Sequence, residues 1–334
     1  MLRIYGFALA VSAVLLALVG IKQGAASFVT VLVLAALEIT FSFDNAIVNA
    51  RILSRMSHAW QTIFMTVGIF IAVFVVRVLL PVFIVSLTSS TGFREVVDLA
   101  LHHSGEYAEK LHVAQPMIAT FGGIFLLMIF LDFVFETRPV KWLKTLETGL
   151  ARVGKVENAT ATLALLALLA VIFLFVPNFE RFKVLIAGTV GLMTYLLVNA
   201  LDSIAGDQSK GGQQVIKAGL VGFLYLELID ASFSLDGVIG AFALTKSIVL
   251  IAAGLGIGAL FVRSMTVHLM RRGVLNNYQY LEHGAHYAIG ILALIMLLSV
   301  KYKIPEFVSG GAGIVVIGAA LLHSHFAAKN KVAI

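Results

Sequence analysis

The sequence contains no cysteine among its 334 residues. Disulfide bonds, thiolate metal ligands and a cysteine nucleophile are therefore all excluded. Charge is scarce too, because only 13% of the residues are Asp, Glu, Lys or Arg, whereas soluble globular proteins have about 25%. Water is therefore not the main solvent of this chain.

Apolar sequence is abundant instead: 60% of the residues are hydrophobic and the mean hydropathy is +0.99. Only helices and closed barrels satisfy the backbone in lipid, and the period-two alternation of barrel strands is missing from runs such as 161–176. We therefore predict an all-α, polytopic membrane protein, a single transmembrane domain over residues 1–334 in the lipid of the cell membrane. The net charge of +6 does not indicate nucleic-acid binding, because the Lys and Arg residues lie in short loops.

Apolar runs of about 17 to 25 residues predict ten spans. The first run also resembles a signal peptide, but its 18 apolar residues exceed the usual ~7 to 15, so we expect a retained helix. The run 214–245 is too long for one straight span, so we expect it to begin in the polar stretch 202–214 or to be broken inside the bilayer. The predicted spans are 4–21, 28–50, 61–88, 115–136, 160–176, 182–200, 214–245, 247–270, 280–300 and 305–327.

Two segments outside these spans carry charge. The segment 91–113 is predicted to form an external amphipathic helix. The basic linker 137–158 is predicted to form a helix on the cytoplasmic membrane surface. The side that holds both termini has 14 Lys and Arg residues and the opposite side has 8, so both termini are predicted to be cytoplasmic.

An acidic motif occurs twice in the chain, each time inside an apolar run. Glu38 and Asp44 belong to the first copy, and Asp230 and Asp236 lie 192 residues further on in the second. Five spans in each half would set the halves in opposite orientations, which indicates an inverted repeat. Repeat one covers about 1–176 and repeat two about 182–327. Each motif is followed, in the next span, by an arginine, Arg77 or Arg263.

Glu38 and Asp44 would not face one point on a continuous helix, because six residues rotate by about 240°. Each motif, however, has a serine two residues before its Asp, Ser42 or Ser234, and Asn or Gly just after it. These residues tolerate local unwinding. Discontinuous helices at the centre would let both motifs meet in one mid-membrane site, as transporters use. Its predicted ligands are Glu38, Asp44, Asn45, Asp230 and Asp236.

Oxygen ligands without thiolate suit Mn²⁺, Mg²⁺ or Ca²⁺ as a bound or transported ion, with no prosthetic group. Glu227 and Asp132 are candidate accessory acids or structural residues, and Arg77 and Arg263 are favoured as charge partners. If all are ionised, the acids and the two arginines have a net charge of minus four, which protons or metal ions must neutralise in hydrocarbon. The six acids are Glu38, Asp44, Asp132, Glu227, Asp230 and Asp236. We expect protons as a counter-ion and no enzymatic activity.

Other interpretations stay open at this point. The acids could pair with the arginines and only fix helix packing. An intramembrane aspartyl hydrolase would also use two Asp residues, but neither Asp here has the Gly-x-Gly-Asp or Tyr-Asp setting. A membrane assembly or insertion factor would carry no flux. His283 and His286 fall near a span end, where a position at headgroup level is favoured over a ligand role for His286.

The segments Glu38-x5-Asp44-Asn45-Ala46-Ile47-Val48 and Ser234-Leu235-Asp236-Gly237-Val238 resemble the TerC family of integral membrane proteins, named for tellurium resistance. Arg77, Arg263-Ser264 and residues 122–126 extend the likeness over most of residues 28–300, closest to a longer branch. The resemblance implies membership of a cation-exporter superfamily and manganese efflux, with the motif acids and Asn45 as the metal site. A carboxylate site would repel tellurite, so tellurium resistance would be indirect. The segments 91–113, 137–158 and 202–214 depart from the shorter members.

Overall fold

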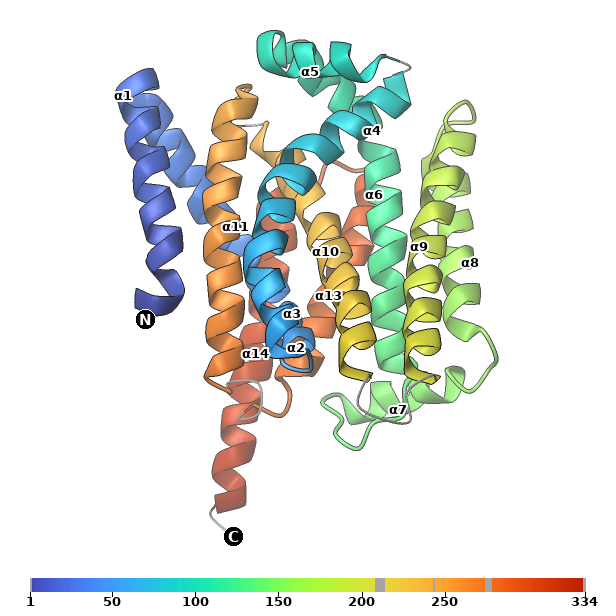
Figure 1. Cartoon of the computed structure of the whole chain (residues 1–334). Coiled ribbons are helices and arrows are strands. Elements are labelled where there is room, and N and C mark those ends of the chain that lie inside the picture. The colour runs from blue at the N-terminus through green and yellow to red at the C-terminus, as the bar shows by residue number, and fades with distance from the viewer. Residues whose placement is uncertain (1, 90, 208–213, 243, 274–277, 333–334) are drawn as a thin grey trace.

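The computed structural model describes residues 2–89, 91–207, 214–242, 244–273 and 278–332. Most residues in these ranges are helical, and none of them is in a strand. Helix α5 lies at the top of Figure 1 and α7 at the bottom, with the long helices running between them. The elements are α1 (Leu2–Phe41), α2 (Phe43–Leu53), α3 (His58–Ile63), η1 (Phe64–Gly68), η2 (Ile71–Leu79), α4 (Leu80–Ser89), α5 (Phe93–His102), α6 (Ser104–Phe135), α7 (Lys144–Val153), α8 (Ala159–Phe175), α9 (Arg181–Asp207), α10 (Gln214–Ala241), α11 (Ile248–Arg271), α13 (Leu281–Ser299) and α14 (Glu306–Val332).

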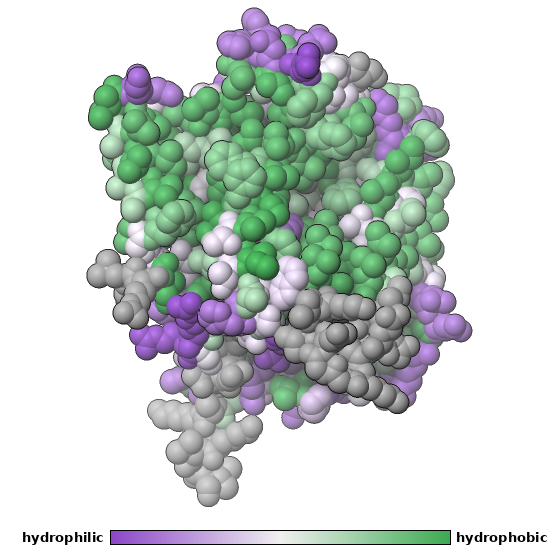
Figure 2. All heavy atoms as spheres, in the orientation of Figure 1, coloured by the Kyte–Doolittle hydropathy of each residue, from purple (hydrophilic) through white to green (hydrophobic). Residues whose placement is uncertain are grey.

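Within the described ranges, 7 helical segments are long and apolar enough to cross a membrane. Figure 2 shows hydrophobic residues over the broad middle of the molecule and hydrophilic residues at the top and toward the bottom. This pattern is consistent with a polytopic membrane protein, so the predicted all-helical class is confirmed. The segments are Ile4–Phe41, Ile71–Ser89, Ser104–Phe135, Arg181–Leu201, Ile248–Arg271, Leu281–Ser299 and Gly310–Ala327.

Helix α1 reverses its direction at Gly24. This glycine has φ 85° and ψ 176°, a backbone conformation that is open almost only to glycine. A Cβ on Gly20 would lie 3.9 Å from the Cβ of Phe28, although eight residues of straight helix would separate them by about 12 Å. Residues 2–23 and 25–41 therefore pack against each other as two helices. The predicted span 28–50 is divided between the second of these helices and α2.

The first acidic motif contains a helix break at Ser42, as predicted. Ser42 has φ −96° and ψ 18° and separates α1 from α2. Its hydroxyl donates to the carboxylate of Glu38 at 3.2 Å. The break changes the direction of the chain between Glu38 and Asp44.

The second motif has no such break, so the prediction of two discontinuous helices is wrong there. Helix α10 runs without interruption from Gln214 to Ala241, through both Asp230 and Asp236. Ser232 returns its hydroxyl to the carbonyl of Leu228 at 2.9 Å, a bond that a continuous helix accommodates. Small polar residues permit unwinding but do not force it. Helix α10 thus covers residues 214–241 of the predicted run 214–245.

The span predicted at 61–88 includes two π-helical segments, η1 and η2. π-Helical turns are rare and recur at functional sites. The hydrophobic pattern does not predict them, because a π turn leaves the hydrophobic composition unchanged. Arg77 lies in η2, and Phe64 is the first residue of η1.

The segment 91–113, predicted as one amphipathic helix, is divided between α5 and the first turns of α6. His103, with φ −126° and ψ 50°, separates them. Val96 and Ala100 of α5 and Tyr107 and Leu111 of α6 pack in one buried cluster with α4, which requires the chain to bend. In the linker 137–158 the predicted helix is present as α7.

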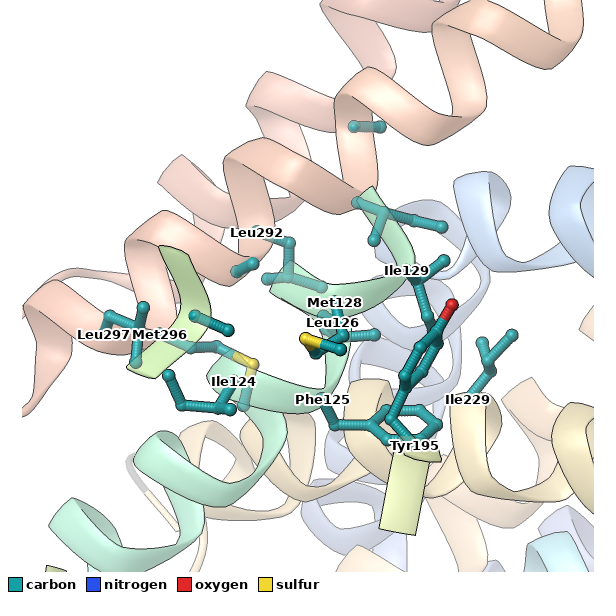
Figure 3. Close-up of a cluster of buried hydrophobic side chains, with 14 of the residues drawn as sticks. Ile124, Phe125, Leu126, Met128, Ile129, Tyr195, Ile229, Leu292, Met296 and Leu297 are labelled. Atoms are coloured by element: carbon teal, nitrogen blue, oxygen red, sulfur yellow. The ribbon is translucent and has the colours of Figure 1, made fainter. Parts of the chain in front are cut away.

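The largest buried cluster brings together α6, α9, α10 and α13. Figure 3 shows Ile124, Phe125 and Met128 of α6 between Met296 and Leu297 of α13 and Tyr195 of α9. A Cβ on Gly122 would lie 2.6 Å from the side chain of Met296, and a Cβ on Gly123 would lie 2.9 Å from that of Leu297. The glycine pair therefore allows α6 and α13 to pack closely, as small residues do between membrane helices.

Candidate functional site

Glu38 and Arg77 form a buried ion pair in the first half of the chain. Glu38 is 5% exposed and Arg77 is 3% exposed, and the Nη2 of Arg77 donates to the Oε1 of Glu38. A second guanidinium nitrogen donates to the carbonyl of Ala72 at 2.7 Å. Glu38 stands at the end of α1 and Arg77 in η2, so this pair joins two consecutive spans.

Arg263 holds two acids in the second half of the chain. Its Nη2 donates to both carboxylate oxygens of Glu227 at 2.9 Å and lies 3.4 Å from Asp230. Its Nη1 donates to the carbonyl of Phe64 at 3.0 Å, and the guanidinium lies 4.1 Å from the centre of the Phe64 ring. In each half, therefore, a motif acid pairs with the arginine of the following span.

The two motifs meet through Asn45 and Asp230. The side-chain amide of Asn45 donates to the Oδ1 of Asp230 at 2.7 Å, although 185 residues separate them in the chain. Both side chains are buried. Hydrogen bonds join Asn45, Glu227, Asp230 and Arg263, and Arg77 with its partner Glu38 is close enough to interact electrostatically with Asp230 and Glu227. We term these six residues the charge centre.

Asp44 is a buried acid next to the charge centre. Its Oδ1 accepts a hydrogen bond from the backbone N–H of Asn45 at 2.8 Å. Its Oδ2 lies 3.0 Å from the point where a Cβ on Gly313 of α14 would stand, so this glycine makes room for the carboxylate. Among the described residues no arginine or lysine pairs with it. The remaining predicted ligand, Asp236, lies on α10, and its side chain is outside the described residues.

Within the described part of the chain, three buried polar oxygens near the centre have no hydrogen-bond donor. They are the Oδ1 of Asn45, the Oδ1 of Asn49 and the Oγ of Ser234. Asn45 and Asn49 are four residues apart on α2 and therefore lie on the same side of that helix. Buried oxygens without a donor are rare in proteins and are suited to accept a cation or a water molecule. Sequence reasoning missed Asn49, although its spacing from Asn45 within an apolar helix was a usable signal.

Asp132 does not belong to the charge centre. It lies on α6, accepts from the hydroxyl of Tyr195 and is 3.4 Å from the amide nitrogen of Asn199 on α9. No contact in the described part of the chain joins it to the two arginines. The structure therefore leaves Asp132 as a separate polar contact between α6 and α9.

Two glycines border the charge centre at very short distance. A Cβ on Gly68 would lie 2.4 Å from Arg263 and 2.7 Å from Glu227, and a Cβ on Gly258 would lie 2.4 Å from the Cβ and Cγ of Glu38. Gly68 belongs to η1 and Gly258 to α11. With glycine at these two positions, the helix backbones approach the buried charges more closely than a residue with a Cβ would permit.

Three acids of the charge centre share two arginines, so their carboxylates are already engaged. Over the described residues, no group of three or more His, Asp or Glu side chains is arranged as a metal site. A charge held in this way is stable only while its partner stays, because an unpaired buried charge is costly.

The helices, the hydrophobic belt and the buried charge centre define the class, a polytopic helical membrane protein. The chain belongs to the family described as "Protein of unknown function (DUF475)", which matches residues 43–331. The matched region begins just after Ser42 and includes every charged residue of the centre except Glu38. No curated protein and no solved structure matches the chain.

Proposed function

We propose that this protein is a divalent metal cation transporter of the TerC type, which exports Mn²⁺ across the cell membrane. The observation that carries the proposal is the hydrogen bond from Asn45 to Asp230. It joins two copies of one acidic motif in a region where every buried charge costs free energy. A pair of acids that only fixed helix packing would not need to occur twice and to meet.

The donor chemistry supports a hard or borderline divalent cation. Carboxylate, amide and hydroxyl oxygens surround the centre, and the chain has no thiolate to select softer metals. Asp44 and the free oxygens of Asn45, Asn49 and Ser234 are the first available donors. Further carboxylates join when a cation displaces Arg77 or Arg263, and protons return as the cation leaves. Ca²⁺ and Mg²⁺ use the same donors and are the competing cargoes.

The proposed architecture has ten crossings arranged as two inverted repeats, with both termini in the cytoplasm. The repeated pairing supports it, since Glu38 with Arg77 in one half corresponds to Asp230 with Arg263 in the other. Alternating access would then proceed around the charge centre as one repeat moves against the other. In this proposal the acids carry a cargo and perform no hydrolysis.

Flux of Mn²⁺ into proteoliposomes tests the proposal directly. We expect time-dependent Mn²⁺ uptake with the purified wild-type chain and a loss of at least about tenfold with Asp44→Asn. Asp98→Asn is the matched control, because Asp98 lies on α5 with a side chain that is 64% exposed. Uptake that is equal in wild type, Asp44→Asn and protein-free vesicles would reject transport. Such a result would favour a membrane assembly factor.

A further inference from the structure

A narrow seam between α2 and α13 leads from Asp44 toward the α7 side of the molecule. Ile47 and Val48 come three and four residues after Asp44, and Arg51 comes four and three residues after them, so these side chains form one stripe along α2. Near Asp44, the position of a Cβ on Gly313 is 3.8 Å from the Cβ of Ala288 on α13. One turn earlier on α13 the seam holds a cavity of about 10 Å³. The cavity is lined by Ile47, Val48, Arg51, Glu282, Ala285 and His286.

This cavity has room for about one water molecule. On the side of Asp44 its walls are apolar or small except for His286, whose Nδ1 lies 2.8 Å from the carbonyl of Glu282. Both of its charged residues, Arg51 and Glu282, stand at the other end. Arg51 is bound to Glu282 at 3.0 Å, and their side chains are 33% and 23% exposed. The ion pair therefore closes the seam where it reaches the surface.

Glu282 is held from several elements at once. Arg55, just after α2, lies 3.8 Å from it, and Arg138, between α6 and α7, lies 3.4 Å from it. Arg138 in turn lies 4.0 Å from the centre of the Phe133 ring, which stacks on His286 at 3.7 Å. One carboxylate thus ties α2 and the α6–α7 connection to the first turn of α13.

The linker closes over the same turn of α13. Glu147 of α7 accepts hydrogen bonds from the backbone of Leu143 at 3.0 Å and from the hydroxyl of Tyr287 at 3.2 Å. It also lies 3.5 Å from His283, whose ring is 3.1 Å from the carbonyl of Val140. Helix α7 is therefore fixed against α13, and its Glu147 lines one cavity together with Arg138.

We propose that Glu282 is the gate of the cargo path on the α7 side. Opening separates Glu282 from Arg51, and α2 moves about the break at Ser42, which exposes Asp44 to the aqueous phase through the seam. Helix α2 is suited to this role because its 11 residues carry Asp44 and Asn45 at one end and Arg51 at the other. The inference rests on the proposed function, since it assigns the access path to the same site.

The absence of native cysteine permits a test by single-cysteine labelling of the full chain. The reporter is Ala285→Cys, at a position that is 1% exposed, in purified protein in lipid nanodiscs. N-Ethylmaleimide is uncharged, so a change of local charge does not itself alter the rate of alkylation. We expect Glu282→Gln to raise this rate by about two- to fivefold, the upper range of the effect of losing one surface ion pair. Val48→Cys on the opposite wall must respond in the same way.

Two controls make the result specific. Glu136→Gln removes an acid that pairs with the same Arg138 but does not bridge α2 and α13, so the rate at Ala285→Cys should stay unchanged. Ala164→Cys, fully buried in α8, should remain unreactive with and without Glu282→Gln. Equal rates in the presence and absence of Glu282→Gln, or a matching rise at Ala164→Cys, would overturn the gate. Labelling does not depend on flux, so a gate can fail while transport stands, and the reverse.

Discussion

The amide of Asn45 lies 2.7 Å from the carboxylate of Asp230 and donates a hydrogen bond to it. This bond connects α2 with α10 at the one place where the two acidic motifs touch within the described structure. It also sets a simple expectation: the contact matters to stability as well as to cargo binding.

Asn45→Ala should lower the free energy of unfolding by about 1.5–3 kcal/mol, because Asp230 would lose a buried hydrogen bond to a charged group. Thermal unfolding in detergent measures this effect. Asn199→Ala serves as the control, since Asn199 is exposed on α9 and its hydrogen bond to Asp132 is longer, at 3.4 Å. Similar melting curves for both variants would contradict a structural role for the Asn45 contact.

Arg77→Gln should be strongly destabilising, by about 3–5 kcal/mol, because it leaves Glu38 charged and unpaired in the interior. The double variant Glu38→Gln with Arg77→Gln should recover much of this loss, since no buried charge remains from the pair. The comparison is made by thermal unfolding of the three proteins. If the double variant melts no higher than Arg77→Gln, the pair is not the reason for the loss.

Gly258→Ala should destabilise the protein by about 1–3 kcal/mol through overpacking. The added methyl group would lie 2.4 Å from Glu38, whereas a Cβ on Gly318 of α14 would meet nothing within 4 Å. Gly318→Ala is therefore the matched control, and we expect it to leave the melting temperature unchanged or slightly raised. An equal effect of the two substitutions would argue against close packing of α11 on Glu38.

Gly24→Ala should weaken the reversal of α1, at a cost of about 1–3 kcal/mol, because its φ of 85° is unfavourable for any residue with a Cβ. Gly6→Ala, also in α1 and with nothing within 4 Å of the added atom, should be neutral. Limited proteolysis around residue 24, together with thermal unfolding, distinguishes the two. A neutral Gly24→Ala would indicate that the turn has other ways to form.

Mn²⁺ should raise the melting temperature of the detergent-solubilised chain, because a ligand at 100 times its Kd adds about 2.7 kcal/mol of stability. Asp44→Asn should abolish the shift, while Asp98→Asn on the exposed α5 should retain it. A shift that persists in Asp44→Asn would exclude this carboxylate as a ligand. The measurement needs no vesicles, so it separates binding from transport.

Composition and periodicity were sufficient to predict the helical membrane class, because long apolar runs have few alternatives in lipid. The duplicated motif led to Glu38, Asn45 and Asp230, and the arginines of the following spans proved to be their partners. These features could be predicted because charges inside apolar segments must find one another. The break at Ser42 followed from the same residues.

The features that could not be predicted depend on three-dimensional context. Ser42 breaks its helix whereas α10 continues past Ser234, since the outcome depends on packing and not on the serine itself. The π-helical segments η1 and η2 leave no mark in composition. Asn49 resembles any polar residue in a span until its free oxygen is seen, and Glu282 becomes notable only when three distant arginines converge on it.

The bond from Arg263 to the carbonyl of Phe64 has a further consequence. Substitution at position 64 removes the aromatic ring above the guanidinium, but every amino acid would retain the carbonyl. Side-chain substitution therefore tests the contact with the ring but not the hydrogen bond to the carbonyl. For this hydrogen bond, the number of residues between α3 and α4 matters more than their identity. One inserted or deleted residue would turn the carbonyl away from Arg263.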